Sequence, residues 1–155
     1  MNSKIILLIC ALLLTSQGVK GQIIDKDNLY GKWRITGDFK EGRQLLSALN
    51  DTIKNPRKYF KYLNRDGTFY SDVVALDWGY RDHIQQGLWF YNKEHNSIIF
   101  HMLKKTFKKK LSKEIIYAKG RGAFREPFER PIVELSKKRM VLHDMWHNSY
   151  GVYKK

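Results

Sequence analysis

Short runs of alternating apolar and polar residues constrain this chain most strongly. They recur roughly every 8 to 12 residues and are separated by turn-forming residues, a pattern typical of antiparallel strands. The clearest turn is Asp66-Gly67, because this dipeptide supplies the positive-φ positions that a tight hairpin requires. Helical periodicity is nearly absent and no βαβ alternation is visible, so we expect an all-β fold with an antiparallel sheet.

Counting these runs predicts eight or nine strands and one short helix. The helix is expected over 41–54, after the first strand, because Leu45, Leu46, Leu49 and Ile53 share one face and Asn55-Pro56 ends it. The expected strands are 29–35, 58–63, 68–75, 84–91, 97–103, 114–118, 132–135, 139–145 and 150–153. Because a long meander tends to close on itself, we expect a small up-and-down β-barrel, with a β-sandwich as the alternative.

The first 21 residues differ in kind from the rest. Lys4 precedes an unbroken apolar run over 5–14, and Val19 and Gly21 fit the small-residue positions of a signal-peptidase site. A run of this length is too short to span a bilayer as a helix, which needs roughly 20 residues. We therefore expect a signal peptide over 1–21, cleavage before Gln22, and one exported domain over 22–155. The expected location is periplasm, cell envelope or exterior.

Cys10 is the only cysteine. Its lipidation is the alternative to simple cleavage, although few apolar residues precede it. After cleavage the chain has no thiol, so disulfides, a thiolate nucleophile and a Cys-ligated zinc are excluded. The domain must then be held together by its core, which a composition of 43% hydrophobic and 14% aromatic residues allows.

The start of the expected first strand resembles a known family. Leu29-Tyr30-Gly31-Lys32-Trp33 resembles the Gly-x-Trp signature of lipocalins, and the segments 63–69, 87–89 and 132–142 resemble the bacterial lipocalin-like domains in the same order. This resemblance implies a calyx-like barrel, open at one end, that holds an apolar or amphipathic ligand. It also implies that Trp33 seals the closed end beneath a basic side chain from the last strand, here Lys instead of the usual Arg.

Period-two counting places a set of bulky side chains inside this barrel. These candidate ligand contacts are Trp33, Leu63, Phe69, Trp89, Tyr91, Leu135, Met140 and Leu142. For Trp33 a structural role in the core is favoured over ligand contact. Such bulk in an eight-stranded barrel leaves room for one small ligand at most. The function expected is thus binding of a small apolar or amphipathic molecule, the alternative being a filled barrel that acts through its surface.

The charge of the chain is the other unusual feature. There are 29 Lys+Arg against 15 Asp+Glu, a formal net charge of +14. The densest part is a lysine cluster formed by Lys104, Lys105, Lys108, Lys109, Lys110 and Lys113. It favours an anionic partner such as lipid headgroups, a polysaccharide or a ligand carboxylate; a merely solvated loop is the alternative. Nucleic acid is not expected, because export removes that target and the aromatic residues alternate with core positions.

No motif indicates catalysis or metal binding. His143 and His147 have the helical spacing of zinc ligands, but they fall on an expected strand, where four residues span roughly 13 Å. The group Asp77, Asp82 and His83 lacks a nucleophile, and Gly120-Arg121-Gly122 lacks the context of a phosphate loop. We therefore expect no enzyme, no metal and no cofactor.

Overall fold

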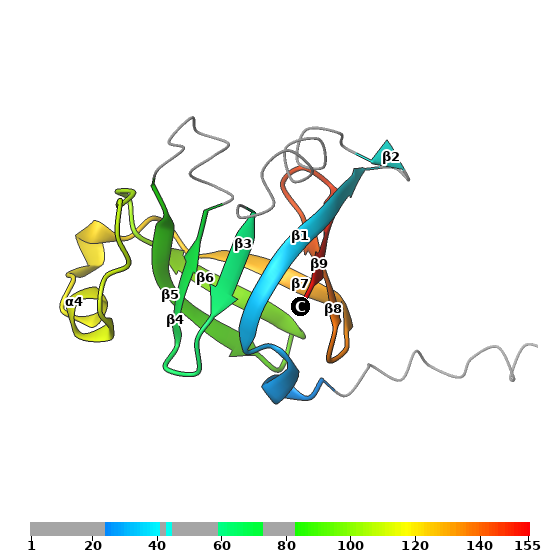
Figure 1. Cartoon of the computed structure of the whole chain (residues 1–155), viewed down its shortest axis with the longest axis horizontal. Coiled ribbons are helices and arrows are strands. Elements are labelled where there is room, and N and C mark those ends of the chain that lie inside the picture. Colours follow the sequence, from blue (N-terminus) through cyan, green and yellow to red (C-terminus); the bar gives the residue numbers. More distant parts are fainter. Residues whose placement is uncertain (1–23, 41–42, 45–58, 73–82) are drawn as a thin grey trace, which may run out of the picture.

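The sheet closes because the first strand pairs with both the second and the last strand of the barrel (Figure 1). The computed structural model describes residues 24–40, 43–44, 59–72 and 83–155. The elements are η1 (Lys26–Asn28), β1 (Gly31–Lys40), β2 (Arg43–Gln44), β3 (Phe60–Leu63), β4 (Thr68–Ser71), β5 (Gln85–Asn92), β6 (Ser97–Met102), α4 (Lys113–Tyr117), η2 (Arg121–Ala123), β7 (Phe128–Leu135), β8 (Arg139–Asp144) and β9 (Ser149–Lys154).

Neighbouring strands pair antiparallel in the order β1, β3, β4 and onward to β9, and β1 then pairs with β9. A register shift between Ile35 and Gly37 lies where β1 passes along β9, as expected of a strand that bends to close a ring. The two-residue strand β2 pairs only with the end of β1, outside the ring. The predicted all-β antiparallel barrel of eight strands is confirmed, and the sandwich alternative is wrong.

The predicted position of the helix is wrong. The described α-helix is α4, which follows β6, the fifth strand of the barrel, and not the first strand. Of the span 41–54, residues 43–44 form β2 and nearly all the rest lies outside the described residues. No helix in the described part of the chain is long and apolar enough to span a membrane.

The strand expected over 114–118 is also wrong, because most of these residues form helix α4. The Ser112 side chain caps its N-terminus by accepting a hydrogen bond from the Ile115 amide, which starts a helical turn. Ile116 is buried, whereas Ile115 and Tyr117 on either side are about half exposed. The apolar residues at 115–117 suggested a strand, but local capping and the burial of Ile116 select a helix.

The hairpin at Asp66-Gly67 forms as predicted. Gly67 has a φ of +80°, and the Asp66 carboxylate accepts hydrogen bonds from the amide and the hydroxyl of Thr68 at 2.9 and 2.6 Å. Asn64 adds a bond to the same hydroxyl at 2.9 Å. Because these contacts are all local, the turn chemistry favours the observed β3–β4 register.

One end of the barrel is closed around Trp33. Its indole is fully buried and donates from Nε1 to the Leu29 carbonyl at 2.7 Å. The Lys155 ammonium lies 4.6 Å from the centre of the indole ring and donates to the Asn28 carbonyl at 2.8 Å. This is the packing expected for Trp33, with Lys in the place of Arg. Helix η1 lies at this end, which we call the proximal end (Figure 1).

Candidate functional site

The barrel interior is apolar near the proximal end. The predicted ligand contacts Trp33, Leu63, Phe69, Trp89, Leu135, Met140 and Leu142 are all buried in one core cluster, and Tyr91 is partly buried against it. Most of them lie toward the proximal end, among the last residues of β3, β5 and β7 and the first residues of β8. They form a packed floor, and their contact with a ligand stays a prediction.

The distal half of the barrel, away from η1, has a different lining. Lys61, Ser71 and Gln85 are direct neighbours across β3, β4 and β5. Lys61 and Ser71 lie two residues from the core side chains Leu63 and Phe69, so they share their inward face. The same spacing places Arg130 and Asp144 inward, two residues from Ile132 and Leu142. Period-two counting could have found these charged positions, but it was applied only to bulky apolar residues.

Lys61 is the most unusual of these residues. Its ammonium lies 4.4 Å from the centre of the Phe100 ring and 5.6 Å from that of Tyr153, so the side chain reaches across the interior from β3 to β6 and β9. Among the described residues its ammonium has no ion pair or hydrogen bond, and Asp144, already paired with Arg130, acts on it as a nearby charge. The pKa of Lys61 is lowered to about 7, mainly by burial and also by the nearby Arg130, while Asp144 opposes this shift.

Although burial lowers its pKa strongly, Lys61 keeps part of its surface accessible to solvent. Partial accessibility together with strong desolvation is expected of a side chain that lines the inside of a barrel. The ring of Phe100 beneath the ammonium packs edge-on against Phe69, with centroids 5.0 Å apart, and stacks on Phe128 at 5.4 Å. The distal half thus combines a desolvated cation with an aromatic surface.

Arg130 and Asp144 form an ion pair on the inward faces of β7 and β8, with side chains 23% and 19% exposed. His147 binds the second carboxylate oxygen of Asp144 at 2.9 Å. Burial alone would raise the pKa of Asp144, but the bonds from Arg130 and His147 outweigh this and hold it at about 2. With Asp144 ionised, the described side chains of this site carry two cations and one anion when Lys61 is protonated.

Gln85 contributes an unpaired acceptor. Its side chain is fully buried, and its amide nitrogen donates to the Leu103 carbonyl. Its Oε1 has no hydrogen-bond partner among the described residues. A buried carbonyl oxygen without a partner is destabilising, so a ligand or water that donates a hydrogen bond would be favoured here.

The strand expected over 139–145 does not continue through the segment 143–147. Strand β8 ends at Asp144, whose carboxylate accepts hydrogen bonds from the Trp146 and His147 amides and forms a turn. His143 binds Asn148 instead, at 3.2 Å, so the two histidines have separate partners. Trp146, 88% exposed, projects from this turn. Of the other polar group, Asp77 and Asp82 lie outside the described residues.

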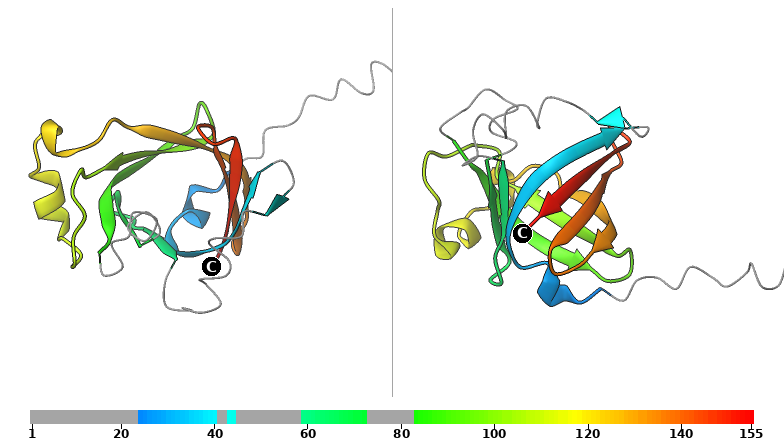
Figure 2. Two further views of the ribbon diagram at one scale, coloured as in Figure 1. Left: turned by 90° about the horizontal axis from the view of Figure 1, so that it is seen from above. Right: turned by 45° about the vertical axis from the view of Figure 1, so that its right-hand side comes forward.

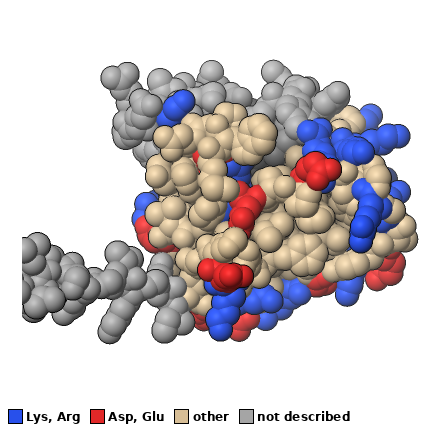
Figure 3. Space-filling model, turned by 180° about the vertical axis from the view of Figure 1, so that it is seen from behind, with Lys and Arg blue, Asp and Glu red and all other residues tan. Residues whose placement is uncertain are grey.

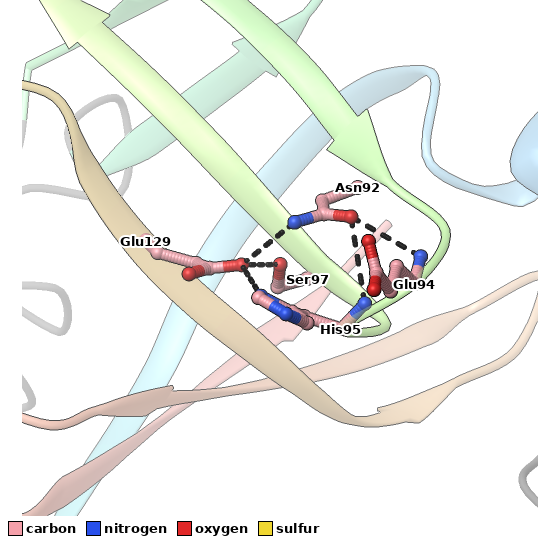
Figure 4. Close-up of polar contacts among 5 residues, drawn as sticks. All are labelled: Asn92, Glu94, His95, Ser97 and Glu129. Atoms are coloured by element: carbon pink, nitrogen blue, oxygen red, sulfur yellow. Dashed lines mark hydrogen bonds and ion pairs between the residues drawn. The ribbon is translucent and has the colours of Figure 1, made fainter.

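A second polar cluster lies on the outer face of β5–β7, as Figure 4 shows. The hydroxyl of Ser97 donates to Glu129, and His95 and Asn92 contact the same carboxylate oxygen, each at 3.2 Å. The Ser97 hydrogen bond is the main reason that the pKa of Glu129 lies below its usual value. Because serine and histidine both bind the carboxylate, neither activates the other. The cluster ties the 93–96 turn to β7.

The six lysines of the lysine cluster are all exposed, as expected for an anion-binding surface. They belong to the segment 103–127, which joins β6 to β7 and lies outside the ring of strands (Figure 2). Their site is therefore separate from the barrel interior.

Comparisons with known proteins give limited information. No protein-family model matches the chain, and no curated protein matches it. One similar solved structure is a lipocalin-like protein from Bacteroides uniformis, with 12% identity, a TM-score of 0.49, and coverage of 83% of this chain and 98% of that one. Another is an uncharacterized protein from Bacteroides eggerthii, with 12% identity, a TM-score of 0.47, and coverage of 81% and 98%.

Proposed function

We propose that this protein binds one small amphipathic molecule inside the barrel. The apolar part of the molecule would lie against the floor formed by the predicted core contacts. Its anionic group would lie in the distal half, beside Lys61 and Arg130. The protein would thus act as a binding protein, without catalysis, metal or cofactor.

A single observation carries this proposal: Lys61 extends into the barrel with no described acceptor for its ammonium. A buried cation without a counter-charge is costly, and desolvation is the first cause of its lowered pKa. A ligand anion would supply the missing counter-charge, and the unpaired Gln85 oxygen would take a hydroxyl or amide donor of the same ligand. In a barrel evolved only to be filled, an apolar side chain at position 61 would be more stable.

The place of action is part of the proposal. The composition of 1–21 supports export with cleavage before Gln22, so we propose that the domain 22–155 works in the periplasm, in the cell envelope or outside the cell. Amphipathic molecules need a carrier or receptor in such aqueous compartments because their apolar parts are poorly soluble.

A dye titration tests the proposal. A neutral apolar dye is expected to bind the full chain at one site. Dodecanoate should displace it at least tenfold more effectively than dodecanol, because a charged hydrogen bond contributes about 1.5–3 kcal/mol. Lys61→Met should remove this preference, whereas Lys154→Met, which changes an exposed lysine of β9, should keep it.

Absence of dye binding would favour the alternative, a filled barrel that acts through its basic surface. Dye binding with equal displacement by dodecanoate and dodecanol would support an apolar cavity but exclude the anion site.

A further inference from the structure

The segment 103–127, which we call the insertion, is attached to the barrel wall by hydrogen bonds. At its base, the Lys104 amide donates to the Ala123 carbonyl and the Arg125 amide to the Met102 carbonyl, at 2.9 and 2.8 Å. Phe107 and Ile84 exchange backbone hydrogen bonds of 2.7 and 3.0 Å. These bonds fix the course of the backbone along the start of β5.

Side chains attach the rest of the insertion. The buried amide of Gln86 donates to the Lys109 carbonyl at 3.2 Å and accepts from the Leu111 amide at 2.9 Å. The Tyr117 hydroxyl donates to the Asp66 carbonyl at 3.0 Å, which ties α4 to the β3–β4 turn. Ile116 is buried although it is not part of the barrel core, so α4 has a buried apolar residue of its own. The lysines therefore sit on a fixed framework.

This framework presents a strongly basic face. The insertion has nine basic residues against two acidic ones. None of the described ion pairs involves a residue of the lysine cluster. Lys110 alone is held by the wall, with its ammonium 4.8 Å from the centre of the Tyr70 ring. Figure 3 shows Lys and Arg gathered at its right edge, the side on which the insertion lies. Asp66 and Glu114 are the described acidic residues that interact with Lys110 or Lys113. Like charges held together with so few counter-charges are costly unless a partner compensates.

Two apolar side chains of the insertion are also exposed. Ile115 is 47% exposed and Tyr117 is 49% exposed, between Lys113 and Lys119 in sequence. A soluble polyanion such as a polysaccharide would be bound by the lysines alone. An anionic bilayer uses both features, since lysines attract its headgroups and apolar side chains enter its interface.

We infer that the insertion docks the protein on an anionic lipid bilayer, with the lysine cluster on the headgroups and Ile115 at the interface. This surface is separate from the barrel interior and does not depend on the ligand proposed above. Docking would place the barrel beside a store of amphipathic molecules.

Vesicle flotation of the full chain tests this inference. The readout is the ratio of binding to phosphatidylcholine vesicles with and without phosphatidylglycerol, which cancels any charge-independent contribution of the N-terminal segment. The test variant is Lys105→Gln/Lys108→Gln/Lys109→Gln, which spares Lys110 because it packs on Tyr70. The matched control is Lys93→Gln/Lys137→Gln/Lys138→Gln, which removes the same charge from exposed turns near the proximal end.

The test variant should lower the ratio roughly a hundredfold at low salt, from about fivefold per lysine, and little in about 1 M salt. The control should lower it severalfold at most. Ile115→Ser should weaken binding to anionic vesicles at both salt concentrations. An equal loss in the control, no preference of the parent for anionic vesicles, or an unchanged affinity of Ile115→Ser would overturn the inference. Binding to heparin without binding to vesicles would instead favour a polysaccharide.

Discussion

The proximal and distal halves of the barrel interior are built from the same strands but lined differently. The proximal half closes over a fully buried Trp33, under the Lys155 ammonium. The distal half holds Lys61, which has no ion pair among the described residues, and the Arg130–Asp144 pair. Because burying a charge without a direct partner costs stability, we propose that Lys61 is kept in the distal half for ligand recognition, while Trp33 stabilises the proximal half. Three single substitutions and one triple variant test this division and the separation of the insertion from the barrel.

Trp33→Ala should have the largest effect. It removes a fully buried ring and its hydrogen bond to Leu29, and we expect it to cost about 3–5 kcal/mol of unfolding free energy. Chemical denaturation measures this loss. Trp146→Ala is the matched control, because that indole is 88% exposed and should change stability by less than about 0.5 kcal/mol. Similar stability of both variants would show that the proximal half is not the stabilising one.

Lys61→Met should stabilise the protein, by up to a few kcal/mol at neutral pH or below. The pKa of Lys61 falls from 10.5 to about 7 on folding. The cost of charging it is therefore fully present below pH 7 and disappears as the pH rises toward 10.5. Arg130 and Asp144 face it from β7 and β8, and Tyr153 faces it from β9; Asp144, with a pKa of about 2, stays ionised over this range. Melting temperatures from pH 6 to 10 measure the difference between variant and parent, and a difference independent of pH would contradict a buried Lys61.

Asp144→Asn should destabilise the protein by about 2 kcal/mol at neutral pH. The folded pKa of Asp144 is about 2, below its usual value, so its stabilising effect is present above about pH 4 and is lost as the pH falls toward 2. Thermal melting across this acid range would detect the loss in the parent and its absence in the variant. The control Asp27→Asn removes a carboxylate from an exposed pair with Arg65 and should change little. Equal effects of both variants would place Asp144 at the surface.

The triple change of Lys105, Lys108 and Lys109 to Gln should have the smallest effect on stability, under about 0.5 kcal/mol, because these side chains are exposed. Calorimetry of the variant measures it. A large loss of stability would show that the lysine cluster stabilises the barrel. It would contradict the claim that the docking surface is separate from the fold.

Sequence reasoning succeeded where the determinants are local. The β3–β4 hairpin follows from Asp66-Gly67, since the turn contacts lie within a few residues. It failed for α4, because the burial of Ile116 between two exposed apolar neighbours cannot be read from a run of three apolar residues. The distal charges were missed for another reason. Lys61 lies two residues from Leu63 and thus on its inward face, yet a lysine is rarely placed inside a barrel. Only the three-dimensional pairing of Arg130 with Asp144 shows that the charges gather at one level of the barrel.

Native mass spectrometry of the protein purified from its own host tests the central proposal most directly. The account predicts an added mass corresponding to one amphipathic molecule with an acidic group, retained by the parent and by Lys154→Met. It should be lost from Lys61→Met and from Arg130→Met, because both remove cations from the distal half. Retention of the same molecule by both distal variants, or a protein of bare mass that also excludes a neutral apolar dye, would contradict it.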